Sequence, residues 1–159
     1  MPTAPSPDEF RRALTRFPTS VTVVTALGDD GPLGATANAV TSLSLQPPLM
    51  LACLDRGSRT LQAVREAGLF AINLLHTGQE ELARGFSTKA PHPDKWLDVG
   101  WAELHGAPVI DDVPLWIACE LRDAYPGGDH EILVGEAAGL GTGSGEPLLF
   151  HGGGYLGFG

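Results

Sequence analysis

The chain has 159 residues and a mass of 16.7 kDa, and we expect one domain over residues 1–159 with a short flexible tail at 1–5. Hydrophobic residues make up 43% of it and charged residues 18%, a globular composition that excludes a disordered chain. Nineteen acidic against ten basic side chains give a net charge of −9, which argues against binding to nucleic acids or to anionic membrane surfaces.

The first predicted element is a helix that starts after the tail. Ser6 is its expected N-cap, and Glu9 three residues later completes a capping box. Apolar residues then recur at helical spacing as far as Phe17, and Pro18 ends the helix.

Seven or eight strands follow, separated by turns that are rich in glycine. Asp29 and Asp30 between two glycines predict a hairpin turn. Most strands follow one another without a crossover helix, so we expect antiparallel pairing. Closing such a sheet removes its edges, which favours a mainly β fold, a small barrel with a few short helices. The predicted strands are 21–27, 33–40, 49–54, 69–75, 101–104, 115–124, 131–140 and 148–156.

Two further short helices are expected. Ser58 is the predicted N-cap of the first, which ends at Gly68. Thr77 and Glu80 form a predicted capping box at the start of the second. The next segment, residues 87–100, holds prolines and charged residues and is predicted to be a polar surface loop.

The two cysteines and the N-terminal sequence bear on the cellular compartment of the protein. Cys53 and Cys119 form no CxxC motif, which favours two reduced thiols in a cytoplasmic protein. The first ten residues lack a signal-peptide pattern, and no apolar run approaches the roughly 18–20 residues of a membrane span.

The sequence gives little support for a hydrolase or for a metal site. There is no GxSxG motif, and the five histidines are scattered without metal-binding spacing, so no metal site is expected. His130 lies between Asp129 and Glu131, but neighbours on a strand point to opposite faces. The glycine-rich stretch 139–145 is followed by no helix, which favours a flexible hairpin loop.

The segment 55–60 is a candidate phosphate site. A strand ends there and a helix begins with Ser58, Arg59 and Thr60 at its N-terminus. Free amides at a helix N-terminus attract anions, and two hydroxyls and a guanidinium would complete a phosphate-binding site, which we call the phosphate cradle. The alternative is an ordinary capped helix with a solvated arginine.

The stretch 34–49, GATANAVTSLSLQPPL, combines small residues with hydroxyl and amide groups. Small side chains let a flat ligand lie against the backbone, and the polar groups can bind its rim. The alternative is an edge hairpin with solvated hydroxyls.

At these segments the sequence resembles the short-chain flavin reductase family. Its members are reductase components of two-component flavin-dependent monooxygenases and have an FMN-binding split-barrel fold. The resemblance covers nearly the whole chain and rests on an ordered set of short motifs: 10–14 with 21–25, the stretch 34–49, Ser58-x-Thr60, 70–75, and Gly128-Asp129-His130 with 134–136.

The resemblance implies roles for particular residues. Thr36, Ala37, Asn38 and Ala39 would lie along the isoalloxazine ring, Ser42 would line the same site, and the strand around Cys53 would back the ring. Ser58, Arg59 and Thr60 would hold the flavin phosphate, helped by Lys89 or Lys95, and His130 would stand where nicotinamide binds.

The resemblance also implies an activity and partners. NADH or NADPH would reduce FMN or FAD, the protein would form a homodimer, and the reduced flavin would serve a partner monooxygenase. The few basic residues favour NADH over NADPH. Alternatives on the same scaffold are a flavoenzyme that retains its flavin and acts on its own substrate, and a non-catalytic flavin- or haem-binding protein. The C-terminus departs from the family because it lacks the arginines usual around its tyrosine.

Overall fold

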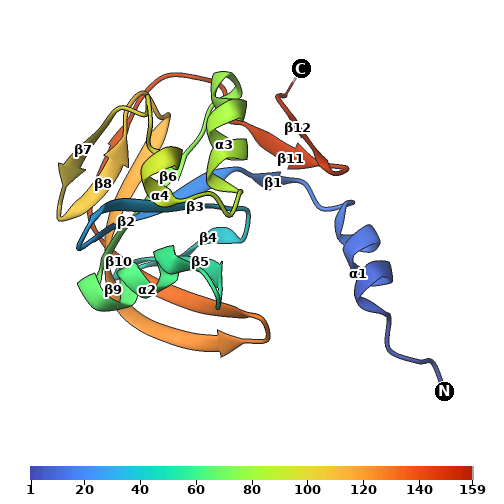
Figure 1. Cartoon of the computed structure of the whole chain (residues 1–159). Helices are drawn as coiled ribbons and strands as arrows, with labels where there is room; N and C mark the ends of the chain where they lie inside the picture. Colours follow the sequence, from blue (N-terminus) through green and yellow to red (C-terminus); the bar gives the residue numbers. More distant parts are fainter. Residues whose placement is uncertain (159) are drawn as a thin grey trace.

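A computed structural model describes residues 1–158, so Gly159, the last residue of the predicted domain, lies outside the described part. Twelve strands and four α-helices in residues 1–158 confirm a mainly β fold with antiparallel sheets and a few short helices (Figure 1). The described residues include no helix with the length and apolar composition to cross a bilayer.

Seven strands form the main sheet, in the order β3-β2-β6-β9-β10-β5-β4. The edge strands β3 and β4 are consecutive in the chain and are joined by only Asn38 and Ala39. So short a connection requires the sheet to curl until its two edges meet, and Figure 1 shows β2 and β3 lying over β4 and β5. The bounds are β2 Thr22–Gly28, β3 Gly31–Ala37, β4 Val40–Leu45, β5 Pro48–Asp55, β6 Leu69–Leu74, β9 Leu115–Gly127 and β10 His130–Thr142.

Helix α2 (Arg59–Ala67) packs one face against the inside of the curled sheet and exposes the other face to solvent. Its buried face, which includes Leu61 and Val64, packs against β2, β3 and β6. Phe70 and Leu133 from the sheet belong to the same apolar core. The helix begins at the predicted N-cap Ser58 and ends at a left-handed Gly68, as expected.

A second apolar core lies under α3 (Glu80–Phe86) and α4 (His92–Lys95), on the other side of β2 and β3. Phe86 and Trp96 meet edge to face there, with ring centroids 4.9 Å apart. The expectation of a polar surface loop at 87–100 is therefore wrong in part, because α4 turns His92 and Trp96 inward.

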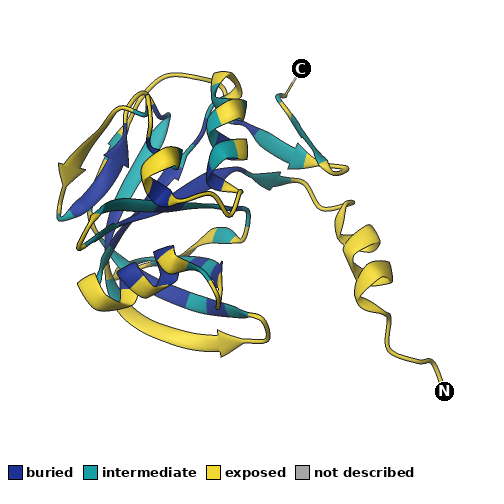
Figure 2. Cartoon of the chain, viewed as in Figure 1, coloured by how far each residue is buried: buried dark blue, intermediate teal, exposed yellow. Residues whose placement is uncertain are grey.

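Helix α1 (Pro7–Leu14) stands apart from the rest of the chain (Figure 1). The predicted capping box is confirmed: Ser6 Oγ accepts from the Glu9 amide at 3.2 Å, and a Glu9 carboxylate oxygen accepts from the Ser6 amide at 2.8 Å. None of its residues is buried, and Figure 2 shows it exposed throughout. The apolar face predicted from the sequence is not buried against any other part of residues 1–158.

Several boundaries differ from the sequence expectation. The predicted Thr77–Glu80 capping box is wrong, because His76 caps a 3-10 helix (Thr77–Gln79) together with Gln79. Its ring Nδ1 accepts from the Gly78 amide at 3.0 Å, so a histidine supplies the acceptor that a threonine was expected to provide.

The C-terminal strand and some short strands also differ from the prediction. The predicted strand 148–156 is a hairpin of β11 (Leu149–His151) and β12 (Gly154–Leu156), turned by two glycines with positive φ. β11 also pairs with β1 (Thr19–Ser20), which was not predicted. The predicted strand 101–104 is confirmed as β7 (Trp101–Leu104), and it pairs with β8 (Ala107–Ile110), which the sequence pattern did not predict. Part of the predicted glycine loop belongs to β10, where Gly139 and Gly141 leave room for the rings of His105 and Trp116.

Candidate functional site

A cavity of about 910 Å³ opens where β3 ends, between the N-terminus of α2, the end of β5 and the segment from α3 to α4. Eleven of the twelve residues singled out from the sequence line it, although they come from five separate stretches of the chain. They are Thr36, Ala37, Asn38, Ala39, Cys53, Ser58, Arg59, Thr60, Lys89, Lys95 and His130.

Ser42 is the residue that the structure does not bring to this cavity. It lies on β4 opposite Met50, and its side chain is exposed. The cavity lining includes the connection up to Ala39, and beyond that point β4 is an edge strand that pairs with β5. The residues after Ala39 therefore belong to the outer edge of the sheet.

The wall formed by β3 is built from small residues. Ala35 and Ala37 line it, with Ala39 just beyond the strand, so the backbone is accessible to a flat ligand. The Thr36 hydroxyl, by contrast, donates to the Ala83 carbonyl of α3 at 2.6 Å. That bond fixes α3 on the edge strand and leaves Thr36 mainly its backbone for ligand contact.

The N-terminus of α2 faces the cavity with unused donors. Ser58 Oγ accepts from the Leu61 amide at 3.3 Å, and the amides of Arg59 and Thr60 have no intrahelical partner. The Thr60 hydroxyl is buried and has no hydrogen-bond partner among the described residues. The Arg59 side chain is exposed and forms no ion pair in residues 1–158. A buried unpaired hydroxyl beside free amides and a guanidinium fits an anionic group of a ligand.

Positive charge is concentrated at this end of the cavity. Burial lowers the pKa of Lys95, and the charge of Arg59 lowers it further. The pKa of His92 falls from 6.5 to about 4, chiefly through burial and then through Lys95 and Arg59. Lys95 and Arg59 are thus close enough to disfavour a positive charge on His92. Such a pair of cations, in a chain of net charge −9, forms a site suited to a phosphate.

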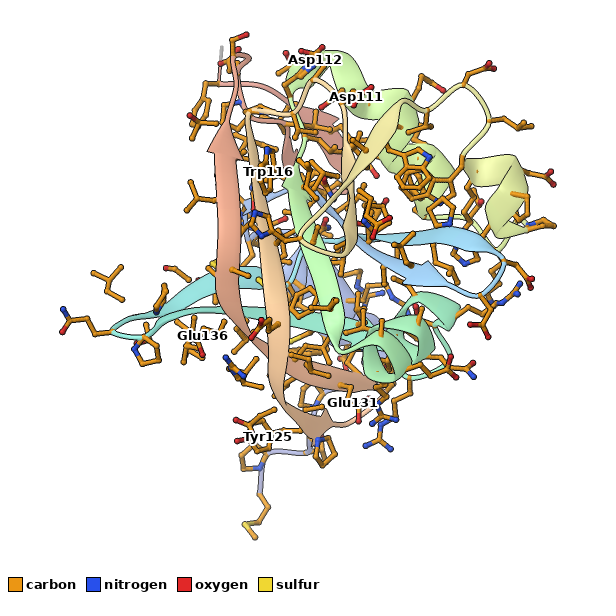
Figure 3. The ribbon with its side chains drawn as sticks, turned by 90° about the vertical axis from the view of Figure 1, so that its left-hand side faces the viewer. Asp111, Asp112, Trp116, Tyr125, Glu131 and Glu136 are labelled. Carbon is orange, nitrogen blue, oxygen red and sulfur yellow. The ribbon has the colours of Figure 1, made fainter. Side chains whose placement is uncertain are left out.

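His130 lines the cavity at the start of β10, where it pairs with Asp55 at the end of β5. Its Nδ1 lies 2.8 Å from a carboxylate oxygen of Asp129, and this hydrogen bond lowers the pKa of Asp129. The next residue, Glu131, is buried and pairs with Arg65 of α2, and Figure 3 shows it beside that helix. The expected opposite orientation of His130 and Glu131 is confirmed.

The two cysteines are free, as predicted. Cys53 lines the cavity, and its amide donates to the Ala39 carbonyl at 2.9 Å, which ties β5 to the connection after β3. Burial raises the pKa of its thiol, and it raises the pKa of the Cys119 thiol to about 12. Both thiols are therefore protonated at neutral pH and unsuited to nucleophilic chemistry.

Sequence reasoning missed several lining residues, which come from segments far apart in the chain. Phe86 and His92 come from the segment predicted to be a helix end and a surface loop, and Phe150 and Tyr155 come from the C-terminal hairpin. Trp96 offered a signal: an aromatic residue four positions after His92 in a polar stretch indicates a helical turn with one buried face. Tyr155 packs against Phe150 with ring centroids 5.3 Å apart.

Comparison with known proteins shows the family of this chain. Residues 14–159 match the family model described as a flavin reductase like domain. A flavin-dependent monooxygenase reductase subunit, HsaB of Mycobacterium tuberculosis, is 36% identical over 156 residues, which cover 95% of this chain and 82% of the relative. A probable flavin reductase of Rhizobium meliloti is 38% identical over 94% of this chain, which spans about half (48%) of that relative.

Solved structures agree as well. The NADH:FAD oxidoreductase SgcE6 of Streptomyces globisporus superposes with a TM-score of 0.90 at 37% identity, covering 99% of each chain. A second structure of SgcE6, in complex with NAD and FAD fragments, gives a TM-score of 0.89. The fold and the cavity thus define an oxidoreductase that reduces flavin. The chain belongs to the flavin reductase family, as its motifs suggested.

Proposed function

We propose that this protein uses NADH to reduce FMN or FAD and supplies the reduced flavin to a partner monooxygenase. One observation carries the proposal. A single cavity of about 910 Å³ contains both the alanine-lined wall at the end of β3 and the unpaired donors at the N-terminus of α2. A volume of this size suits a nucleotide cofactor. A bound flavin would accept hydride from the nicotinamide, so the protein's task is to bind and orient two rings.

The flavin phosphate would lie at the N-terminus of α2. Arg59 and the hydroxyls of Ser58 and Thr60 would donate to it, with Lys95, or Lys89 from the exposed part of the same segment, adding positive charge. The isoalloxazine ring would then lie along Ala37, Asn38 and Ala39, with Cys53 behind it.

The nicotinamide would bind near His130. Asp129 orients the imidazole through its Nδ1, which leaves Nε2 free to contact the dinucleotide. NADH is the proposed donor because relatives of this chain are named as NADH-dependent flavin reductases. The low number of basic residues also offers little to bind a 2′-phosphate.

The proposed assembly is a homodimer. Three large apolar side chains on and after α1 are exposed without a partner in residues 1–158: Phe10 by 55%, Leu14 by 45% and Phe17 by 68%. Burying them against a second copy would remove an apolar surface that the monomer leaves in water. Replacing Phe10 and Leu14 with aspartate should yield a monomer in sedimentation experiments, and an unchanged sedimentation coefficient would contradict this interface.

The proposed partner is a flavin-dependent monooxygenase, because several relatives are named as monooxygenase reductase components. The two free thiols support a reducing compartment, and we place the protein in the cytoplasm.

The test is NADH consumption in air by the purified protein, with and without added FMN or FAD. We expect a rate that rises with added free flavin and saturates. Tightly bound flavin with poor use of free flavin would instead support a flavoenzyme with its own substrate. Flavin binding without NADH consumption would contradict the reductase activity.

A further inference from the structure

His92 is a cavity residue to which neither the motifs nor the family comparison assigns a task. It begins α4, and the residue is only 8% exposed although it lines the cavity. Its ring Nδ1 accepts the Gly34 amide at 3.4 Å. β3 is an edge strand, so its outward amides have no strand partner, and His92 takes one of them.

This contact fixes which ring nitrogen carries the proton. Because Nδ1 accepts a hydrogen bond, the proton of the neutral imidazole must sit on Nε2. Nε2 has no hydrogen-bond partner among residues 1–158. The pKa of about 4 keeps the ring neutral at physiological pH. His92 therefore carries an unused N–H donor in a largely buried position on the cavity wall.

The neighbours of His92 show what such a donor would meet. Lys95 is three residues later on α4, and Arg59 is the first residue of α2; both are close enough to lower the pKa of the imidazole. An anion attracted by these two cations would come within reach of the same wall. A neutral donor adds a hydrogen bond to that anion without adding charge repulsion when the cavity has no ligand.

We propose that His92 binds the flavin phosphate through Nε2–H, together with Arg59 and Lys95. The inference rests on the proposed function and extends it, because it adds a neutral donor from α4 to the cradle at the N-terminus of α2. The Nδ1 contact with Gly34 positions the ring, and the Nε2 contact binds the ligand.

Two substitutions separate these contacts. In His92→Asn the amide oxygen can take the place of Nδ1 and keep the Gly34 contact, but no group reaches the Nε2 position. In His92→Gln the longer side chain can place an NH₂ group near Nε2, while the Gly34 contact is lost. His151→Gln, at an exposed histidine outside the cavity lining, is the matched control.

The measurement is the Kd for FMN and for riboflavin, which lacks the phosphate, by quenching of flavin fluorescence. We expect His92→Asn to raise the Kd for FMN about tenfold or more, the usual effect of losing a hydrogen bond to a charged group. His92→Gln should stay within about threefold of the wild type, and the Kd for riboflavin should change in neither variant. Equal weakening of FMN and riboflavin binding by His92→Asn, or an unchanged Kd for FMN, would overturn the proposal.

Two further readouts identify the anion and keep the test independent of catalysis. If His92→Asn raises the KM for NADH and leaves the Kd for FMN unchanged, the phosphate belongs to the dinucleotide and our assignment is wrong. Inorganic phosphate should shift the ¹⁵N resonance of His92 Nε2 in the wild type, and the absence of a shift would contradict the site. A wild type that binds phosphate in this way but fails to consume NADH would refute the proposed function and leave the anion site standing.

Discussion

The side chain of Asn73 joins three segments of the fold at once. Its Oδ1 accepts the amide of Ile110 on β8 at 2.9 Å, while its Nδ2 donates to the Val23 carbonyl at 3.0 Å and to the Thr25 hydroxyl at 3.1 Å. Asn73 has no exposed surface, so water cannot replace these bonds. A polar residue near the end of β6 (Leu69–Leu74) thus fixes the β7–β8 hairpin on the main sheet.

We expect Asn73→Leu to lower the free energy of unfolding by about 2–4 kcal/mol, because it leaves buried polar groups without partners. Urea denaturation followed by circular dichroism measures this change. Thr41→Ala, at an exposed threonine, is the control and should change the free energy of unfolding by less than about 0.5 kcal/mol. A similar small effect of Asn73→Leu would show that the network adds little to stability.

Arg59→Ala tests the phosphate cradle at α2. The substitution removes the guanidinium that would form charge-assisted hydrogen bonds to the flavin phosphate, and we expect FMN binding to weaken by about 1.5–3 kcal/mol. Riboflavin binding should change little. Arg122→Ala is the control, because Arg122 pairs with Glu120 and Glu136 outside the cavity lining. Unchanged FMN affinity would remove Arg59 from the site.

His130→Ala tests the nicotinamide side of the cavity. We expect hydride transfer in stopped-flow experiments to slow by about tenfold to a hundredfold, because the donor ring loses a positioning contact. The Kd for FMN should stay nearly unchanged. Asp129→Asn weakens the hydrogen bond that orients the ring and should give a smaller loss in the same direction. A normal rate at saturating NADH would exclude His130 from this task.

His92 should make the stability of the protein depend on pH. Its pKa is about 4 in the folded chain and 6.5 ordinarily, so between these values the unfolded chain binds a proton that the folded chain does not. The free energy of unfolding should therefore fall as the pH falls from 6.5 towards 4, with a slope that approaches about 1.4 kcal/mol per pH unit for one proton. Below pH 4 His92 contributes no further loss.

Urea denaturation at several pH values, compared between the wild type and His92→Asn, isolates this contribution. The variant should show a flatter pH dependence between pH 5 and 6.5. The carboxylates of Glu9 and Asp129 have lowered pKa values, through hydrogen bonds with Ser6 and His130, so their contributions are lost at more acidic pH. An equal slope in the wild type and the variant would contradict a neutral buried His92.

The sequence by itself was sufficient for several local features, although not for the cap after β6, where His76 and not Thr77 supplies the acceptor. The caps of α1 and α2 followed from Ser6 and Ser58, since a capping hydroxyl needs only the amide of its own first turn. The antiparallel pairing of the strands could be predicted because most strands follow one another in the sequence without a crossover helix. The resemblance to the family singled out eleven residues that line one cavity in the fold.

Other features depended on partners distant in the chain, and only the tertiary structure decided them. His92 was predicted to lie in a surface loop; the edge amide of Gly34, 58 residues earlier, draws its ring inward. Ser42 shared the polar pattern of the stretch 34–49, but the chain passes from one edge of the sheet to the other after Ala37, so Ser42 lies outside the cavity. Local sequence determined the caps of α1 and α2 and most of the strands, whereas burial and cavity lining are set by contacts between segments that only the curled sheet brings together.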